Sequence, residues 1–468
     1  MRRLVIAASP GEFRGAVAGA EALVDFRLVR TVGGSAIGEV FLGRVVKLLP
    51  ALQAVLVDIG EERPAFLSAA DAAPRHDLAG LAEGTSVVAQ VKRGARADKA
   101  AAVTLRPRLR GRLLDWSPGR LGVVAEEIGR GDRERVVARV AGLLRPGEGV
   151  RLHTGAADAS PEMLAAAVAA LRARWSAIEE RRARAVPPAC LETLPPLVGM
   201  LEALVDDALE EILVDDPIVL AETRAWLARE HPALGARASL HRGDAPILEA
   251  AGLAEAVAGL LELRVGLPGG GALTIEPTAA ATLIDVDSGS LAGERTGGED
   301  ALLAMNLSAA AAVARQIRLR GLAGALVVDF VALRQRAHRE GLLEAFRVAL
   351  EAEVPDAQLL GWTRLGHVEL TRPRRAAPLH EMVFERTAYG GYVKTALTVG
   401  LEALAAVASR VAAEPARAPT LRVHPAVAAI LATEAAPAVQ ALETRIGRKV
   451  TVLPEPARAR DGFDIGAA

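Results

Sequence analysis

The sequence has few aromatic residues, a single cysteine and almost no net charge, and each shortage excludes a class of protein. Aromatic residues make up 3% of the 468-residue chain against 51% hydrophobic residues, so alanine and leucine supply much of the core. The single cysteine, Cys190, excludes an internal disulfide and any zinc site with several cysteines, and it is typical of a reducing cytoplasm. With 56 basic and 57 acidic residues, a nucleic-acid site would have to be a local basic patch.

Long hydrophobic runs are also absent. No stretch of about 18 apolar residues lacks a charge, so we predict no membrane span. The apolar segment 4–8 is too short for a signal peptide and stops at Ser9 and Pro10. We therefore expect a cytoplasmic protein, with roughly three domains by its length.

The most informative residues are aspartates in two predicted strands. Strand 281–287 carries Asp285 and Asp287, and the apolar strand 325–330 carries Asp329. Side chains at i and i+2 of a strand share a face, so neighbouring strands would bring the three carboxylates together. Such oxygens suit Mg²⁺, which keeps an open side for phosphate, and this pattern indicates phosphoryl chemistry. The alternative is that each aspartate caps a helix or closes a turn.

The segments around these strands alternate between strand and helix. Helices at 300–320 and 337–351 and a strand at 358–362 complete a β-α-β pattern, which predicts an α/β domain. Strands at 3–8, 13–17 and 22–30 are too few for a domain, so we expect them to complete a sheet made elsewhere. Helices are predicted at 132–144 and 161–184, and the chain from residue 454 onwards reads as a loose tail.

Residues 35–115 have the pattern of a small β-barrel. Short predicted strands are separated by glycine and proline, and the loop 92–99 carries four basic residues. A barrel with one basic loop is the usual layout of an OB-type binder of single strands, although such a charge run can also be a plain solvated loop.

Together these motifs make the chain resemble the catalytic region of the bacterial ribonuclease E/G family. The resemblance rests on short motifs that occur in the family's order along nearly the whole chain, at 43–45, 57–60, 65–67, 211–217, 284–289, 306–307, 315–320, 328–330 and 366–372.

The resemblance implies a multidomain α/β fold. Its expected parts are an RNase H-like sheet (1–34 and 188–271), an S1 barrel of OB type inserted in it (35–119), a 5′-sensor subdomain (120–187), a DNase I-like nuclease core (272–376) and a small C-terminal α/β domain (377–468).

The family's site residues can be carried over by position. Asp285 and Asp329 match the aspartates that hold the catalytic Mg²⁺. Asp287 stands where the family typically has asparagine, and we expect it to join the catalytic site as a third metal ligand or as an orienter. Arg96 and Lys99 match basic residues of the S1 loop that grip RNA.

Other matched positions concern RNA contact. Phe66 matches an aromatic residue of the S1 surface, whereas Leu56 replaces its partner aromatic. Arg318 and Arg320 could bind phosphate or pair with nearby acids, and Asn306 is expected to pack or hydrogen-bond near the metal loop. His338 and His367 are interpreted as structural or surface residues.

The sequence also departs from the family. In the 5′-phosphate sensor Thr154 is kept, but His153 replaces an arginine, which predicts weaker or pH-dependent sensing. The C-x-x-C zinc link is missing, and His380 and Glu381 do not replace it, so we expect no structural zinc. A homodimer or homotetramer without a zinc bridge stays open.

The resemblance predicts an Mg²⁺-dependent endoribonuclease that cuts single-stranded RNA, in rRNA and tRNA precursor processing and mRNA turnover. Two alternatives remain: an S1-type RNA-binding protein without catalysis, and a scaffold for ribosome maturation.

Overall fold

The computed structural model describes residues 2–467 except 21, 34–36, 73–77, 79, 96–99, 120, 121, 127, 244, 269, 290–297, 375, 388, 389 and 415–417. The chain forms two compact units. One, the split unit, is made of Met1–Gly33 and Pro195–Ala468, and the other, the inserted unit, is the contiguous segment Gly34–Leu194.

The first sheet of the split unit contains strands from both of its chain segments. Three antiparallel strands form one side, and two strands from beyond residue 210 extend the sheet in parallel from β1. The order is β14-β13-β1-β2-β3, with β1 Arg3–Ser9, β2 Glu12–Ala18, β3 Leu23–Arg30, β13 Glu211–Val214 and β14 Ala238–Leu240. The expectation that the first strands complete a sheet made elsewhere is therefore confirmed.

Helices α3 (Pro196–Leu204) and α4 (Pro217–Glu230) pack on this sheet. The start of α4 follows from its sequence, because the Asp216 carboxylate accepts hydrogen bonds from the N–H groups of Ile218 and Val219, and proline occupies the first helical position. The short elements that follow are η4 Pro232–Arg237, α5 Ile247–Ala250 and α6 Ala254–Gly259.

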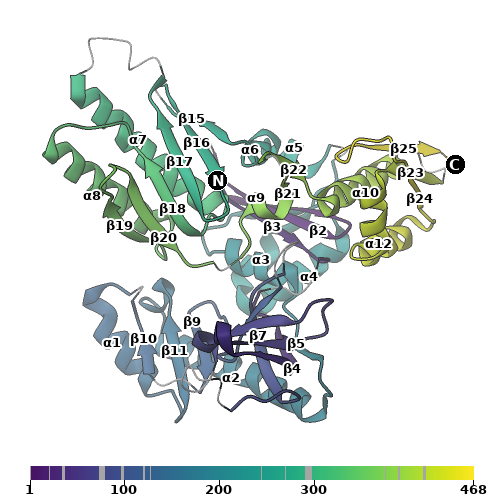
Figure 1. Cartoon of the computed structure of the whole chain (residues 1–468), viewed down its shortest axis with the longest axis horizontal. Coiled ribbons are helices and arrows are strands. Elements are labelled where there is room, and N and C mark those ends of the chain that lie inside the picture. Colours follow the sequence, from purple (N-terminus) through teal and green to yellow (C-terminus); the bar gives the residue numbers. More distant parts are fainter. Residues whose placement is uncertain are drawn as a thin grey trace. The chain divides into compact units, whose positions relative to one another are not determined.

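The second sheet carries the three aspartates. Its six strands run in the order β15-β16-β17-β18-β20-β19, with bounds Arg264–Gly266, Ala272–Pro277, Ala281–Asp287, Gly324–Asp329, Val368–Arg372 and Gln358–Trp362. Helices α7 (Gly298–Leu319) and α8 (Arg336–Glu353) cover one face of this sheet (Figure 1) and leave the other open. The strands and helices predicted for 281–362 are confirmed, with helix ends shifted by one or two residues.

The last part of the split unit holds a hairpin and a small α/β layer, with elements α9 Leu379–Val383, β21 Phe384–Arg386, β22 Tyr392–Lys394, α10 Ala396–Ala413, β23 Pro419–Val423, α11 Pro425–Ala432, α12 Ala436–Ile446, β24 Thr451–Pro454 and β25 Phe463–Ala467. The prediction of a loose tail is wrong: β25 pairs antiparallel with β23, because alternate residues Phe463 and Ile465 pack on the core and Arg422 pairs with Asp464 at 3.2 Å.

Within the described residues, no single helix is long and apolar enough to cross a membrane. Helices α11 and α12 reach the required length and hydropathy only as a pair bent by 78°.

A closed barrel forms the first part of the inserted unit. Five strands close the ring in the order β4-β5-β6-β8-β7, since β4 pairs with both β5 and β7, and β12 adds to the edge of β4. The bounds are β4 Val40–Leu49, β5 Ala54–Asp58, β6 Ala65–Ser68, β7 Ser86–Arg93, β8 Ala102–Thr104 and β12 Ala189–Glu192, with η1 Pro50–Leu52 and η2 Ala69–Asp71 between strands. This arrangement is consistent with an OB-like fold, so the predicted barrel is confirmed.

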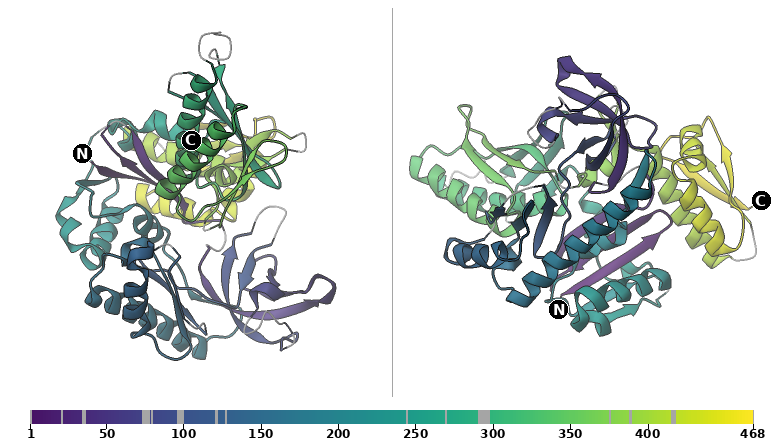
Figure 2. Two further views of the ribbon diagram at one scale, coloured as in Figure 1. Left: turned by 90° about the vertical axis from the view of Figure 1, so that its left-hand side faces the viewer. Right: turned by 90° about the horizontal axis from the view of Figure 1, so that it is seen from below.

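A three-stranded sheet with two helices forms the rest of the inserted unit. The sheet order is β10-β11-β9, and the elements are β9 Leu114–Pro118, β10 Gly122–Val124, α1 Arg130–Ala141, β11 Glu148–Leu152, η3 Thr154–Ala156 and α2 Pro161–Arg184. The long helix α2, visible along its length in the right-hand view of Figure 2, has the bounds predicted from the sequence.

Candidate active site

Asp285 and Asp329 stand opposite each other on neighbouring strands. Strands β17 and β18 are parallel, and their register pairs these two aspartates directly. Ile284 and Val328, which precede them, are buried against α7 and α8, so the aspartates lie on the open face of the sheet. The two aspartates therefore stand on strands about 5 Å apart, with both side chains on the open face.

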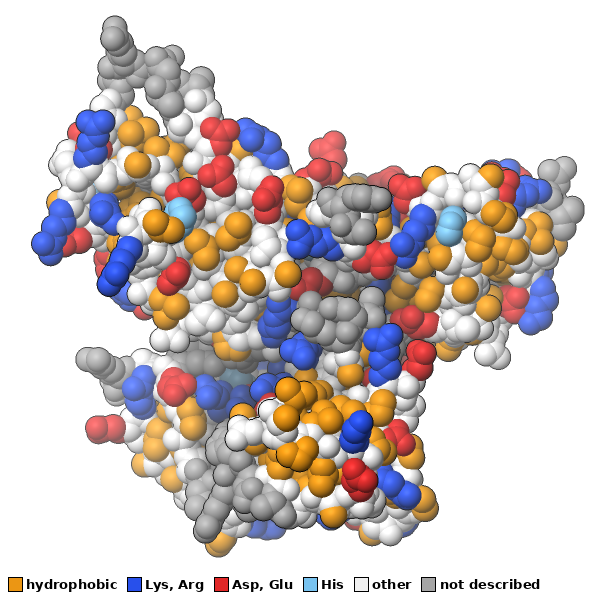
Figure 3. Space-filling model, in the orientation of Figure 1, with side chains coloured by type: hydrophobic (Ala, Val, Ile, Leu, Met, Phe, Trp, Pro, Cys, Tyr) orange, Lys and Arg blue, Asp and Glu red, His pale blue; other side chains and the backbone are white. Residues whose placement is uncertain are grey.

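The open face of this sheet is acidic around the pair. Glu276 on β16 and Glu369 on β20 are exposed on the same face. Figure 3 shows Asp and Glu side chains gathered over the six-stranded sheet, in the upper left of the view. This accumulation of negative charge favours a bound cation.

The ionisation of Asp285 reflects this crowding. Burial raises the pKa of Asp285, and the negative charges of Asp329 and Asp287 raise it further. A divalent cation would relieve that repulsion. The site fits Mg²⁺, because the donors are carboxylate oxygens and the open face leaves room for the waters and phosphate oxygens that Mg²⁺ keeps when one or two carboxylates bind it.

Asp287 shares the face but is engaged elsewhere. Its carboxylate accepts hydrogen bonds from the N–H of Gly289 at 2.9 Å and from Arg264 at 3.0 Å, and both lower the pKa of Asp287. In the part of the chain that the structure describes, no group of three His, Cys, Asp or Glu side chains is arranged to hold a metal. The role of Asp287 as a third ligand stays a prediction.

Asn306 fixes the loop that follows Asp329. This fully buried side chain on α7 donates to the carbonyl of Val331 at 2.8 Å and accepts from the N–H of Val331 at 3.1 Å. The predicted hydrogen bonding of Asn306 is confirmed at the loop that follows Asp329.

Arg318 and Arg320 lie away from the open face. Arg318 pairs with Glu353 and Asp25, which is the acid-pairing alternative. Arg320 is 5% exposed and donates to Gln316 and to the carbonyl of Glu262, and burial lowers its pKa to about 10. Their proposed RNA contacts therefore find no support in the geometry.

The predicted RNA-binding residues of the barrel are only partly described. Phe66 on β6 is half-buried and stands opposite Leu56 of β5. Arg96 and Lys99 lie outside the described residues, so their prediction stands as it was.

The predicted sensor residues sit at the end of β11. Nε2 of His153 lies 3.0 Å from Oδ1 of the buried Asp115, whereas Thr154 is exposed. Burial acts to raise the pKa of Asp115, but the hydrogen bond and charge of His153, with Arg108 and Arg110, outweigh it and lower that pKa. An internal carboxylate thus competes with any phosphate for His153.

The residues in place of the zinc link serve the fold. The His380 ring contacts the rings of Phe384 and Tyr392, and burial together with the charge of Arg320 lowers its pKa to about 4. Glu381 accepts two hydrogen bonds from Arg374 at 3.0 Å.

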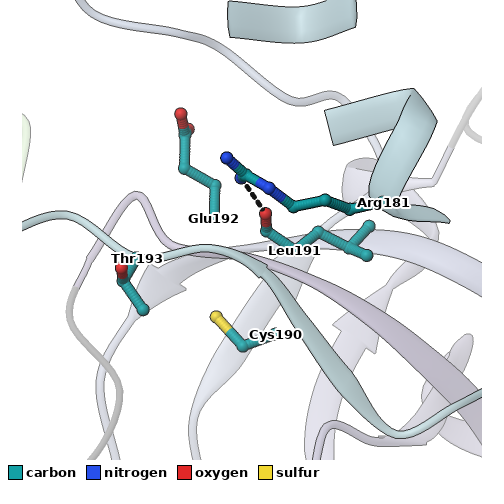
Figure 4. A pocket seen from close by; sticks show the side chains of 5 residues that line it. All are labelled: Arg181, Cys190, Leu191, Glu192 and Thr193. Carbon is teal, nitrogen blue, oxygen red and sulfur yellow. Dashed lines mark hydrogen bonds between the residues drawn. The ribbon is translucent and has the colours of Figure 1, made fainter. Parts of the chain in front are cut away.

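A pocket of about 330 Å³ lies in the inserted unit, lined by Arg181, Cys190, Leu191, Glu192 and Thr193. Figure 4 shows the Arg181 guanidinium directed to the carbonyl of Leu191, a bond that fixes it to the backbone. Burial raises the pKa of the Cys190 thiol, which makes it a poor nucleophile at neutral pH. The pocket contains none of the predicted site residues.

Paired carboxylates on an open sheet face and a separate closed barrel are the parts of an enzyme that acts on nucleic acid. Comparison with known proteins gives the family: the model of the ribonuclease E/G family matches residues 108–375, more than half of the chain. The chain belongs to the ribonuclease E/G family and is an endoribonuclease, an enzyme that cuts RNA at internal positions.

Relatives match along the whole chain. The ribonuclease G proteins of Salmonella typhimurium (strain SL1344) and Escherichia coli (strain K12) are each 28% identical to it, with 99% of both chains covered. Ribonuclease E of Nostoc sp. (strain PCC 7120) is 34% identical over 76% of this chain and 54% of its own length.

Proposed function

We propose that Asp285 and Asp329 hold one Mg²⁺ and that the enzyme hydrolyses single-stranded RNA at this point of the open sheet face. The observation that carries the proposal is the register of β17 and β18, which sets the two carboxylates opposite each other. When bound, Mg²⁺ would polarise the scissile phosphate and lower the pKa of an attacking water.

The chain's own residues would position the carboxylates and the RNA. The rigid pairing of β17 with β18 fixes the separation of the two carboxylates, and Asn306 holds the backbone just after Asp329. Asp287, which accepts a hydrogen bond from Arg264, would add a third carboxylate beside the cation, as a ligand or an orienter. In the barrel, Phe66 would stack on a base, and Arg96 and Lys99 would bind phosphates.

The finer domain assignment is part of the same proposal. Three antiparallel strands continued by two parallel ones support an RNase H-like sheet, and the closed ring supports an S1 barrel. The sheet with α1 and α2 would be the 5′-sensor subdomain, and the aspartate-bearing sheet the DNase I-like core. We further propose a cytoplasmic role in rRNA and tRNA precursor processing and mRNA turnover, with self-association that needs no zinc bridge.

The test is cleavage of a 5′-monophosphorylated, AU-rich single-stranded RNA with and without Mg²⁺. Internal cuts should require the metal and should vanish in Asp285→Asn and in Asp329→Asn, while both variants still bind the RNA. Glu340→Gln, which changes an exposed acid on α8, is the matched control and should cut normally. Binding without cutting by the wild type, across several metals, would contradict the mechanism and leave the non-catalytic RNA-binding or scaffold alternative.

A further inference from the structure

His367 lies at the end of the row of residues that contains the aspartate pair. Strands β18 and β20 are antiparallel, and Val328 pairs with Val368, so the next step of the register sets Asp329 opposite His367. Thr274 on β16 pairs with Asp285 on the other side. One row therefore reads Thr274, Asp285 and Asp329 on three strands, followed by His367, the residue just before β20.

The imidazole is directed at Asp329. Nε2 of His367 lies 3.7 Å from Oδ2 of Asp329, and the ring is 35% exposed. Among the described residues, Asp329 is the one acidic residue paired with this ring. The sequence interpretation of His367 as a structural or surface residue did not anticipate this position.

The backbone under the ring is fixed. The N–H of Thr363 donates to the carbonyl of His367 at 2.8 Å, and the hydroxyl of Thr363 accepts from the N–H of His367 at 3.1 Å. The same hydroxyl accepts from the N–H of Leu365 at 3.2 Å, which closes the turn between β19 and β20. The imidazole therefore projects from a rigid turn rather than from a free loop end.

We infer that His367 is a positioning residue for Asp329. The 3.7 Å between Nε2 and Oδ2 is an ion-pair distance, longer than a hydrogen bond. A small rotation of the ring would bring its N–H within bonding distance of Oδ2, which would restrain the carboxylate and leave its other oxygen for a cation. Residues that hydrogen-bond metal-binding carboxylates orient them in this way, and losing one typically costs about 10–100-fold in metal affinity or activity. The inference rests on the proposed metal site, whose failure would be seen separately.

A second histidine beside acids provides a matched comparison. His338 on α8 lies 3.3 Å from Glu299 and 3.4 Å from Asp300, at the start of α7, and neither acid belongs to the row. Its contacts join two helices, so its loss should change stability and leave metal affinity as it is.

The experiment measures the dissociation constants of Mg²⁺ and Mn²⁺ by calorimetry on the full chain without RNA. We expect His367→Ala to weaken binding about 10–100-fold, and His367→Gln, whose amide can replace the ring N–H, to stay close to the wild type. His338→Ala should bind metal as the wild type does. If His367→Ala does not fold, His367→Asn, whose amide is shorter, replaces it in the comparison with Gln.

Three outcomes separate the hypotheses. Unchanged metal affinity in His367→Ala would overturn the positioning role while leaving the metal site intact. Absence of saturable binding in the wild type, or binding that persists in Asp329→Asn, would instead overturn the metal site itself. RNA cleavage by His367→Ala that recovers at saturating metal would support the positioning role, because the defect would then lie in metal binding.

Discussion

Arg264 reaches across β16 to hold Asp287 on β17, with Nη2 of Arg264 3.0 Å from Oδ2 of Asp287. The side chains are 63% and 44% exposed, and exposed pairs of this kind are weak. Asp287 is therefore a third carboxylate near the proposed metal-binding aspartates, and Arg264 restrains it only loosely.

Releasing Asp287 should have a small effect on metal binding. In Arg264→Gln, the loss of a weak pair predicts Mg²⁺ binding that is tighter by about fivefold at most, measured by calorimetry. Asp287→Asn should weaken binding far less than Asp285→Asn. Equal losses in these two aspartate variants would make Asp287 a full ligand.

Phe66 should matter for RNA affinity in proportion to its stacking. Phe66→Ala should weaken binding of a single-stranded oligonucleotide by about 1–3 kcal/mol, the usual value of a base–aromatic stack, as measured by fluorescence anisotropy. Leu56→Ala, at the opposing position, should have a smaller effect, and Leu56→Phe should tighten binding. Equal effects of Phe66→Ala and Leu56→Ala would exclude stacking on Phe66.

Arg318 should matter for stability and not for RNA. Its guanidinium pairs with Glu353 and Asp25 and its side chain is only 18% exposed, so Arg318→Gln should cost about 1.5–3 kcal/mol in free energy of unfolding. Denaturant unfolding measures this cost, and RNA affinity measured on the folded variant should be unchanged. Weaker RNA binding with unaltered stability would restore the phosphate-binding alternative.

The pair of Glu148 with Arg172 should stabilise the inserted unit. Both carboxylate oxygens of Glu148 accept from Arg172 at 2.7 Å, and these bonds lower the pKa of Glu148 to about 2. Arg172→Ala should cost about 1.5–3 kcal/mol at neutral pH, because Glu148 then keeps the N–H of Arg145 at 2.9 Å but loses its cationic partner. On the same helix, Arg182→Ala breaks an exposed pair with Glu179 and should cost about 1 kcal/mol or less.

The pH dependence of this pair has a definite sign. Since the folded pKa of Glu148 lies below its usual value, the stabilisation is complete above about pH 4.5 and is lost as the pH falls towards 2. The difference in unfolding free energy between wild type and Arg172→Ala should shrink over that range. A difference that stays constant with pH would contradict the assignment.

Asp215 should behave in the opposite sense. Burial raises its pKa to about 6, although the N–H of Ala8 donates to it at 2.8 Å. The folded protein therefore holds this proton up to about pH 6, and stability falls as the pH rises from about 4 to 6. Asp215→Asn removes the buried charge and should stabilise the protein at pH 7 by up to about 3 kcal/mol, with little effect at pH 4. Destabilisation at pH 7 would show that the charge is needed.

Much of the aspartate-bearing sheet could be predicted because its signals are local. The apolar strands around Asp285 and Asp329 and the long amphipathic helices each carry their own periodicity. The barrel could be predicted from its short strands, which are separated by glycine. The β-α-β pattern predicted that β17 and β18 are neighbours, because such a unit brings consecutive parallel strands together.

The remaining features depend on pairings between distant residues, which a sequence pattern does not contain. Strand β25 was missed because its alternation is short and lies beyond a polar stretch with two prolines, Pro454 and Pro456. Its pairing with β23 is what places it in a sheet. The contact of Arg264 with Asp287 and that of His367 with Asp329 each join different strands. The same holds for Arg318, whose acidic partners lie 293 and 35 positions away in the chain.

The nested order of the chain also affects how the protein is made. Strand β1 is the central strand of its sheet, and its parallel partner β13 comes much later in the chain, at Glu211–Val214. On a ribosome, the segment Gly34–Leu194 is a contiguous unit that emerges while β1–β3 still lack that partner. Domains generally fold as units during synthesis. Here the inserted unit can fold first. Strands β1–β3, which are synthesised earliest, keep an unpaired edge until β13 is made, and an unpaired strand edge is prone to misassembly.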